Sequence, residues 1–264
     1  MAGQIDITPR QREIADLVRA HGFASVEALA DRFAVTTQTI RRDLARLCEH
    51  GILRRTHGGV EPPVSSGNID YARRRILNMS QKRAIAETVA AHVPDGASLA
   101  FSIGTTPEIV MQALTERKGL RIFTNNLHVA FTASQIAEFE VTIAGGRLRH
   151  GDRDTLGPET ERFFSAYKVD IGVFGVAGVD QDGTLLDFHE EEVAARQAIL
   201  ANCRRAFLVL DATKFGRTAH VRGGHVTDVA AVFCDKPLPH PIADRLRAAG
   251  RQVEVCAGME EDRA

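Results

Sequence analysis

The sequence predicts an α/β protein in two parts, a small N-terminal winged helix-turn-helix and a larger C-terminal domain with a mostly parallel sheet. Near the N-terminus, apolar residues recur at helical spacing in three short segments, and a glycine-bearing segment typical of a β-ribbon follows them. Farther along the chain, short apolar runs alternate with helix-like segments. This alternation is typical of parallel strands buried between two layers of helices.

The N-terminal helices are predicted from their caps and apolar stripes. The first begins at Thr8, where a threonine, a proline and a glutamine satisfy or remove the free N–H groups of a first helical turn. Ser25 caps a second helix, and Thr36 or Thr37 caps a third. The third helix turns three apolar side chains inward: Ile40, Leu44 and Leu47.

The opposite face of this third helix suits the major groove of DNA. It carries Gln38, Arg42 and Ala45, with further polar residues on its flanks. Arginine contacts guanine or phosphates, glutamine addresses adenine, and a small alanine permits close approach to the duplex. The predicted DNA-binding residues are Ser25, Thr36, Thr37, Gln38, Thr39, Arg41, Arg42, Arg46, Arg54, Arg55 and His57.

Residues 51–60 are predicted to form a two-stranded wing whose arginines meet backbone phosphates. The chain has a formal net charge of −1 and a pI near 6.8, which excludes a protein that coats nucleic acid through overall basicity. DNA binding must therefore come from the local arginine patch. The alternative is that the three helices form a dimerisation cap and the arginines a solvated face.

The predicted domain boundaries follow from composition. Residues 6–61 form the winged helix-turn-helix, residues 62–80 a linker that begins with prolines and serines, and residues 81–256 the C-terminal domain. Basic residues at 73–75 and 82–83 either touch DNA or solubilise a helix, and the sequence favours the second reading.

Other functional classes are not indicated. The four cysteines are scattered singly, which suggests neither a disulfide framework nor a zinc site, and no cofactor is expected. No apolar run reaches the length of a membrane span, and the first residues do not resemble a signal peptide. We therefore expect a cytoplasmic protein without a membrane partner.

Polar residues follow the predicted strands of the C-terminal domain, at the edge where parallel sheets bind ligands. Ser102–Glu108 form a glycine turn leading into a helix, whose free N–H groups and dipole favour an anion. Thr124–Asn126, Gly145–Arg147 and Asp211–Arg217 follow three other strands. Amides, hydroxyls and cationic side chains at one rim fit a small phosphorylated polyol.

Several motifs resemble the DeoR family of transcription regulators. The segments Thr39–Leu44 (T-I-R-R-D-L) and Arg55–Val60 (R-T-H-G-G-V) resemble its winged helix-turn-helix, and Lys82–Cys256 resemble its sensor domain. The resemblance implies a fold related to sugar-phosphate isomerases and CoA transferases for the C-terminal domain. It also implies a repressor that binds double-stranded operator DNA as a homo-oligomer, a dimer or tetramer.

The resemblance is strongest to the branch of the family that controls glycerol metabolism, which implies sn-glycerol 3-phosphate as the effector. One position departs from the family pattern, because Ser102 stands where an aspartate is usual. A hydroxyl accepts a hydrogen bond but carries no charge. From the segment 187–192 only Glu192 is carried over, as an effector-side or capping carboxylate. The expected effector-binding residues are Ser102, Gly104, Thr105, Thr106, Asn125, Asn126, Gly146, Arg147, Glu192, Lys214 and Arg217.

Three alternatives remain at this point. The chain is a regulator of another sugar-phosphate operon, or a sugar-phosphate isomerase or deaminase, or its C-terminal domain only oligomerises and binds no ligand. Asp187, Glu192 and Lys214 are the residues that an isomerase would use. No compact acid/base pair is evident in the sequence, so we expect no enzymatic activity.

Overall fold

The computed structural model of the chain describes residues 7–21, 23–50, 52–56, 59–61 and 71–256. The chain divides into two compact units, Met1–Ser66 and Gly67–Ala264, and each is described by itself. The division falls inside the predicted linker 62–80. Of that stretch, residues 62–70 lie outside the described residues, whereas Tyr71–Ile76 form helix α4 and helix α5 begins at Met79.

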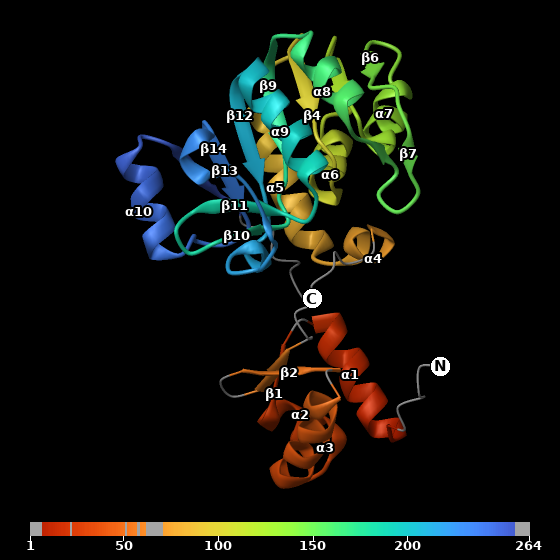
Figure 1. Ribbon diagram of the computed structural model, residues 1–264, viewed down its shortest axis with the longest axis vertical. Helices are drawn as coiled ribbons and strands as arrows, with labels where there is room; N and C mark the ends of the chain where they lie inside the picture. The colour runs from red at the N-terminus through yellow and green to blue at the C-terminus, as the bar shows by residue number, and fades with distance from the viewer. Residues whose placement is uncertain (1–6, 22, 51, 57–58, 62–70, 257–264) are drawn as a thin grey trace. The chain divides into compact units, whose positions relative to one another are not determined.

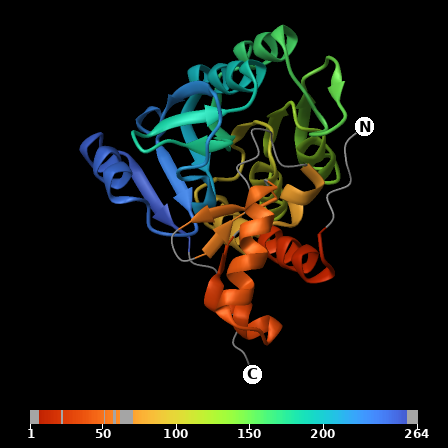
Figure 2. The same cartoon turned by 60° about the horizontal axis from the view of Figure 1, so that its bottom comes forward.

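The N-terminal unit contains the predicted helices and wing (Figures 1 and 2). Its helices are α1 (Pro9–His21), α2 (Val26–Phe33) and α3 (Thr37–Glu49). Its strands, in the sheet order β1-β3-β2, are β1 (Ala24–Ser25), β3 (Gly59–Glu61) and β2 (Arg54–Thr56). At the start of α1, the Gln11 backbone N–H donates to Thr8 Oγ1 (3.2 Å) and the Thr8 backbone N–H donates to Gln11 Oε1 (3.1 Å), as the predicted cap requires.

One apolar core holds this unit together. It draws Ile14 from α1, Leu29 from α2, Ile40 and Leu47 from α3, and Val60 from the wing, all at most 1% exposed. Burying a side chain of this size stabilises a fold by about 1.5–3 kcal/mol. The third helix is therefore fixed by its inner face, which leaves its polar face outward.

The C-terminal unit is built on a seven-stranded sheet whose pairs are all parallel, which confirms the predicted α/β fold (Figure 1). In sheet order the strands are β15 (Gln252–Val255), β14 (Ala231–Cys234), β12 (Cys203–Val209), β9 (Val169–Phe174), β4 (Ser98–Phe101), β5 (Arg121–Thr124) and β6 (Glu140–Ile143). Because the strands are parallel, their carboxyl ends meet at one edge.

Helices cover both faces of this sheet. One face packs against α5 (Met79–Ala91), α6 (Thr105–Ala113) and α7 (Leu127–Ser134) through side chains such as Leu99 and Phe101. The other packs against α8 (Pro158–Ser165), α9 (Glu190–Asn202) and α10 (His240–Ala248) through side chains such as Ala100 and Leu208. Successive side chains of one strand thus point to opposite faces of the sheet, and both faces are buried. Each strand therefore appears in the sequence as a continuous apolar run.

Two smaller sheets were not predicted from the sequence. β7 (Leu148–Arg149) and β8 (Asp154–Thr155) form a short hairpin between β6 and α8. β10 (Gly178–Val179), β11 (Thr184–Asp187) and β13 (Val221–His225) form a three-stranded antiparallel sheet. Their strands are short and lack a clear alternation, so they give a weak sequence signal. None of the helices in the described part of the chain has the length and apolarity needed to span a bilayer.

Candidate DNA-binding surface and effector site

The outer face of α3 is polar and accessible. Gln38, Arg41, Arg42 and Arg46 are exposed, whereas the apolar side chains of the same helix are buried. Thr37 and Ala45 are half-buried beside them. The predicted division of α3 into an inner apolar and an outer basic face is therefore present.

Three hydroxyl side chains of the predicted set fix where the helices begin. Ser25 Oγ accepts a hydrogen bond from the Ala28 backbone N–H (3.1 Å), and Thr36 Oγ1 accepts one from the Thr39 backbone N–H (3.2 Å). The hydroxyls of Thr36 and Thr39 lie 3.0 Å apart. These caps bring the N-termini of α2 and α3, whose dipoles favour anions, to the surface with exposed or half-exposed hydroxyls.

The wing adds two exposed arginines, Arg54 and Arg55, on strand β2. Arg55 pairs with Val60 across the ribbon, and Val60 is fully buried, so the core holds the wing through β3. His57, also predicted to contact DNA, lies outside the described residues.

The buried carboxylate of Asp43 joins α3 to α1, which sequence reasoning did not identify. It accepts hydrogen bonds from Arg10 Nε (2.7 Å) and Gln11 Nε2 (2.9 Å), and it is 6% exposed. The aspartate of the T-I-R-R-D-L motif thus orients the basic helix rather than presenting a charge to solvent. A carboxylate among apolar positions of an amphipathic helix was the available signal.

Replacing Asp43 with alanine is expected to destabilise the N-terminal unit by about 1–3 kcal/mol, because the buried amide of Gln11 loses its acceptor. Urea unfolding followed by circular dichroism measures the change. Asp31→Ala, at an exposed position of α2, is the matched control and should leave stability unchanged. Equal stabilities of the two variants would show that the Asp43 contacts contribute nothing.

At the carboxyl edge of the large sheet, β4 leads through the predicted turn into α6. Gly104 has φ +117°, a backbone conformation that favours glycine, and caps α6 without a side-chain hydrogen bond. Ser102, Thr105 and Thr106 are buried beside it, at 2%, 7% and 6% exposure. The start of α6 is therefore a sheltered helix N-terminus lined by hydroxyls.

The two predicted asparagines, fully buried after β5, have structural partners. Asn126 Oδ1 accepts from the His128 backbone N–H (2.9 Å) and caps α7, while its Nδ2 donates to the Gly104 carbonyl (3.4 Å). Asn125 Nδ2 donates to the Thr155 carbonyl (2.7 Å), whereas its Oδ1 has no hydrogen-bond partner among the described residues. The asparagines thus hold the turn at Gly104 and the β7–β8 hairpin in place.

Lys214 and Arg217 lie in the loop after β12, at the same edge. The ammonium of Lys214 has no hydrogen bond or ion pair within the described part of the chain. Burial, with the charges of Arg217, Arg74 and Lys82, lowers its pKa to about 8, and the charge of Asp211 opposes the shift. The pKa of Arg217 is lowered by burial and by Arg74. Neighbouring cations disfavour each other's charged form, which contributes to both shifts.

Arg74 of α4 and Lys82 of α5 complete this group, which we call the cationic cluster: Arg74, Lys82, Lys214 and Arg217. Lys82 is 4% exposed, and burial lowers its pKa to about 8 against the opposing charge of Asp211. Sequence reasoning assigned this basic segment to the solvent, and for Lys82 the structure corrects that reading. The spacing along the helix could have predicted this burial, because Lys82 lies three, four and seven residues before Ile85, Ala86 and Val89, which form the buried apolar face of α5.

Carboxylates lie on the other side of this edge. Glu192, 6% exposed in the first turn of α9, accepts from Arg149 Nη1 (3.0 Å). Burial and the charge of Asp187 raise the pKa of Glu192, against the effect of Arg149. Asp187 accepts from the buried Arg196 (2.6 Å) and acts electrostatically on Arg217.

Gly146 and Arg147 lie on an exposed stretch before the β7–β8 hairpin, and the structure shows no hydrogen bond or ion pair of the Arg147 side chain among the residues it describes. The next arginine, Arg149, points inward to Asp154 (2.7 Å) and Glu192. Of the two arginines of this segment, the structure joins Arg149 rather than Arg147 to the other polar residues of the edge.

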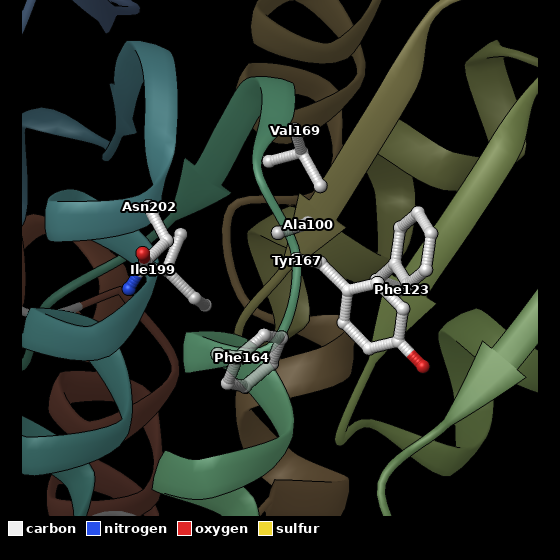
Figure 3. Close-up of a pocket in the computed structure, with 7 residues that line it drawn as sticks. All are labelled: Ala100, Phe123, Phe164, Tyr167, Val169, Ile199 and Asn202. Atoms are coloured by element: carbon white, nitrogen blue, oxygen red, sulfur yellow. The ribbon is translucent and has the colours of Figure 1, made fainter.

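A small apolar depression with no room for a water molecule lies elsewhere, among Ala100, Phe123, Phe164, Tyr167, Val169, Ile199 and Asn202 (Figure 3). The rings of Phe123 and Tyr167 lie 4.3 Å apart between centroids, tilted by 38°. It carries no cation and contains none of the predicted effector residues. The described cysteines are all free, and no group of described side chains could hold a metal ion.

Both parts of the chain match known families. Residues 10–65 match the DeoR-like helix-turn-helix domain, and residues 77–236 match the DeoR C terminal sensor domain. Both are domains of transcription regulators, so the alternative of a sugar-phosphate isomerase is not supported.

Similar proteins are aligned over nearly their full length. The chain is 41% identical to the glycerol-3-phosphate regulon repressor of Escherichia coli K12 over 249 residues, which covers 94% of this chain and 99% of that protein. It is 41% identical to the repressor of the same name from Haemophilus influenzae, covering 94% and 97%. It is 35% identical to the HTH-type transcriptional repressor CsqR of Escherichia coli K12, covering 96% of each.

Among solved structures, the translation initiation factor eIF-2B of Pyrococcus horikoshii aligns with a TM-score of 0.44 at 14% identity, covering 84% of this chain and 81% of that one. Ribose 5 phosphate isomerase A of Neisseria gonorrhoeae aligns with a TM-score of 0.37 at 12% identity, covering 53% and 54%. With both domain families matched in order and relatives aligned end to end, the chain belongs to the DeoR family of transcription regulators, with an N-terminal DNA-binding domain and a C-terminal sensor domain.

Proposed function

We propose that this protein is a repressor that leaves its operator when a small phosphorylated sugar or polyol binds at the carboxyl edge of its sheet, with sn-glycerol 3-phosphate as the effector. The observation that carries the proposal is the cationic cluster beside the hydroxyl-lined start of α6. The relatives named for glycerol 3-phosphate support the choice of effector. The controlled genes would then serve glycerol metabolism, and the protein would act in the cytoplasm, where its DNA lies.

The chemistry of the edge fits such an effector in two parts. The phosphate would be held by Lys214, Arg217 and the free N–H groups of α6, since charge-assisted hydrogen bonds to phosphate are the strongest available. The polyol hydroxyls would meet carboxylate and hydroxyl acceptors, including Glu192 and Ser102. With Ser102 neutral, the acceptor for a hydroxyl is weaker than a carboxylate, so we expect orientation of the polyol to depend more on Glu192.

On the DNA side, α3 would enter the major groove and the wing arginines would contact phosphates, in a dimer or tetramer that reads repeated half-sites. An effector weakens DNA binding only through its different affinity for two conformations, with a coupling of typically about 1–3 kcal/mol. Release should therefore be graded, shifting operator affinity by about 5- to 150-fold at saturating effector.

The test is fluorescence anisotropy of a labelled operator fragment with the full-length protein and increasing glycerol 3-phosphate. Fructose 6-phosphate, glycerol and inorganic phosphate are the comparisons, all at matched ionic strength because salt alone weakens DNA binding. Selective release by glycerol 3-phosphate supports the proposal. Release by another phosphosugar only would keep the mechanism and reject this effector, and no release by any would reject phosphate sensing.

Effector affinity should fall as pH rises above about 8. In the free protein the pKa values of Lys82 and Lys214 are about 8, so both ammonium groups lose their protons above that pH. A bound phosphate dianion favours the charged lysines, so binding above about pH 8 takes up protons and weakens about tenfold per pH unit for each lysine that holds the phosphate. The phosphate is already a dianion from about pH 7.

Calorimetric titrations between about pH 7 and about pH 9.5 measure this dependence. A dissociation constant that stays flat across this range would show that neither lysine contacts the phosphate. Lys118→Met, at an exposed position before β5, should retain the full pH dependence.

A further inference from the structure

Lys82 is a charged side chain on the apolar face of a helix. Lys82 is 4% exposed and lies on helix α5, within electrostatic reach of Asp211 in the loop after β12. A buried ammonium is unfavourable unless its protons find acceptors, because desolvation opposes the charge. The buried ammonium of Lys82 therefore needs hydrogen-bond acceptors.

The structure gives this ammonium one acceptor, the main-chain carbonyl of Arg74 in α4. An ammonium has three protons to donate, and within the described residues no carboxylate forms an ion pair with it. The nearby carboxylate Asp211 is already engaged, since its Oδ1 accepts from Asn78 Nδ2 (3.2 Å), the Thr213 backbone N–H (3.1 Å) and the Thr213 hydroxyl. Lys82 thus retains donors that no described group uses.

Lys82 belongs to the cationic cluster, and its charge contributes to lowering the pKa of Lys214. The nearby Glu108 does not neutralise the cluster, because it accepts from the Tyr71 hydroxyl (2.7 Å) and pairs with Arg75 (3.1 Å). Asp152 is paired with Arg74. The buried Lys82 and the half-buried Lys214 thus both have ammonium donors that no described group uses, near carboxylates that accept hydrogen bonds from other residues.

We propose that Lys82 is a direct ligand of the effector's phosphate, together with Lys214. This rests on the proposed function, and it extends the site from the loop after β12 to helix α5. The short connection between α4 and α5 is joined to the loop after β12 by the Asn78–Asp211 hydrogen bond. A phosphate that draws the Lys82 ammonium toward it also loosens the contact with the Arg74 carbonyl, and α4 lies within the predicted linker 62–80.

The competing role for Lys82 is purely structural: its ammonium holds α4 in place by donating to the Arg74 carbonyl. Lys82→Met and Lys82→Gln separate the two roles. Both remove the charge, and glutamine keeps an N–H donor for the carbonyl. Binding a phosphate requires the positive charge of residue 82, whereas the structural role requires only an N–H donor at that position.

The experiment is isothermal titration calorimetry of the full-length protein with sn-glycerol 3-phosphate and with inorganic phosphate, combined with melting temperatures of the unliganded variants. We expect both variants to raise the dissociation constant for glycerol 3-phosphate by at least about tenfold, as loss of a hydrogen bond to a charged group implies. We expect Lys82→Met to melt at the wild-type temperature or above, because a desolvated charge is removed. Arg83→Met, the exposed neighbour, should behave as the wild type.

Wild-type affinity of Lys82→Gln for glycerol 3-phosphate would overturn the proposal. A lowered melting temperature of Lys82→Met with unchanged affinity would also overturn it. Both results are expected if Lys82 has only the structural role. A wild-type protein that binds neither probe would instead overturn the proposed function, and the role of Lys82 with it. The wild-type titration distinguishes these two failures.

Discussion

Lys214→Met is expected to raise the dissociation constant for glycerol 3-phosphate by about 10- to 100-fold, because a hydrogen bond to a charged group contributes about 1.5–3 kcal/mol. Lys214 is the cation for which this contribution should be largest, since its ammonium has no other partner within the described residues and is surrounded by further cations. The operator should remain bound at effector concentrations that release the wild type. Titration calorimetry and operator anisotropy measure the two effects.

Operator affinity without effector should be the same in Lys214→Met and wild type, because the substitution lies in the C-terminal unit. Lys118→Met is the matched control for both measurements, being an exposed lysine on the same unit. Normal release of Lys214→Met by glycerol 3-phosphate would show that the phosphate does not bind at Lys214, and would redirect the search to other cations of the edge.

Arg42→Ala is expected to weaken operator binding by about 5- to 150-fold per contacted half-site, since a specific arginine–base contact is worth about 1–3 kcal/mol. Arg42 is exposed on the outer face of α3, opposite the core residues Ile40, Leu44 and Leu47. Alanine is the best helix former, so the helix itself should persist. Anisotropy with operator and scrambled DNA measures the loss.

Salt dependence distinguishes the kind of contact that Arg42 makes. If it binds a phosphate, the slope of log affinity against log salt should become less negative by about 0.9 per contact, and operator and scrambled DNA should lose affinity alike. If it reads a base, operator binding alone should weaken. Arg245→Ala, an exposed arginine on α10, is the control. Unchanged operator affinity in Arg42→Ala would remove this residue from the DNA-binding surface.

Much of the fold could be predicted because its signals are local. The Thr8 and Gln11 hydrogen bonds, the Thr36 cap and the continuous apolar run of β4 depend on neighbours a few positions away. The parallel order also followed, since buried strands separated by helices pack in few ways. The β7–β8 hairpin and the β10–β11–β13 sheet were missed because strands of so few residues carry too little pattern.

The candidate site was predicted in part. The turn at Ser102–Thr106 and the loop of Lys214 and Arg217 were found because each directly follows a strand, where the sheet geometry brings them to one edge. Asn125 and Asn126 were found for the same reason, yet their hydrogen bonds show them supporting the turn and the hairpin. Position after a strand predicts that a residue lies near the site, and only its partners show what it does there.

By itself, the sequence determined the two-part α/β organisation, the basic outer face of α3 and the edge of the sheet that carries polar groups, because these follow from periodicity and from caps. The tertiary structure alone decided that Lys82 is buried against the Arg74 carbonyl, that Asp43 orients α3 and that Arg149 rather than Arg147 turns inward. These contacts join residues as far apart as the 133 positions between Asn78 and Asp211. No local pattern encodes such a pair, because its energy exists only once the chain has folded.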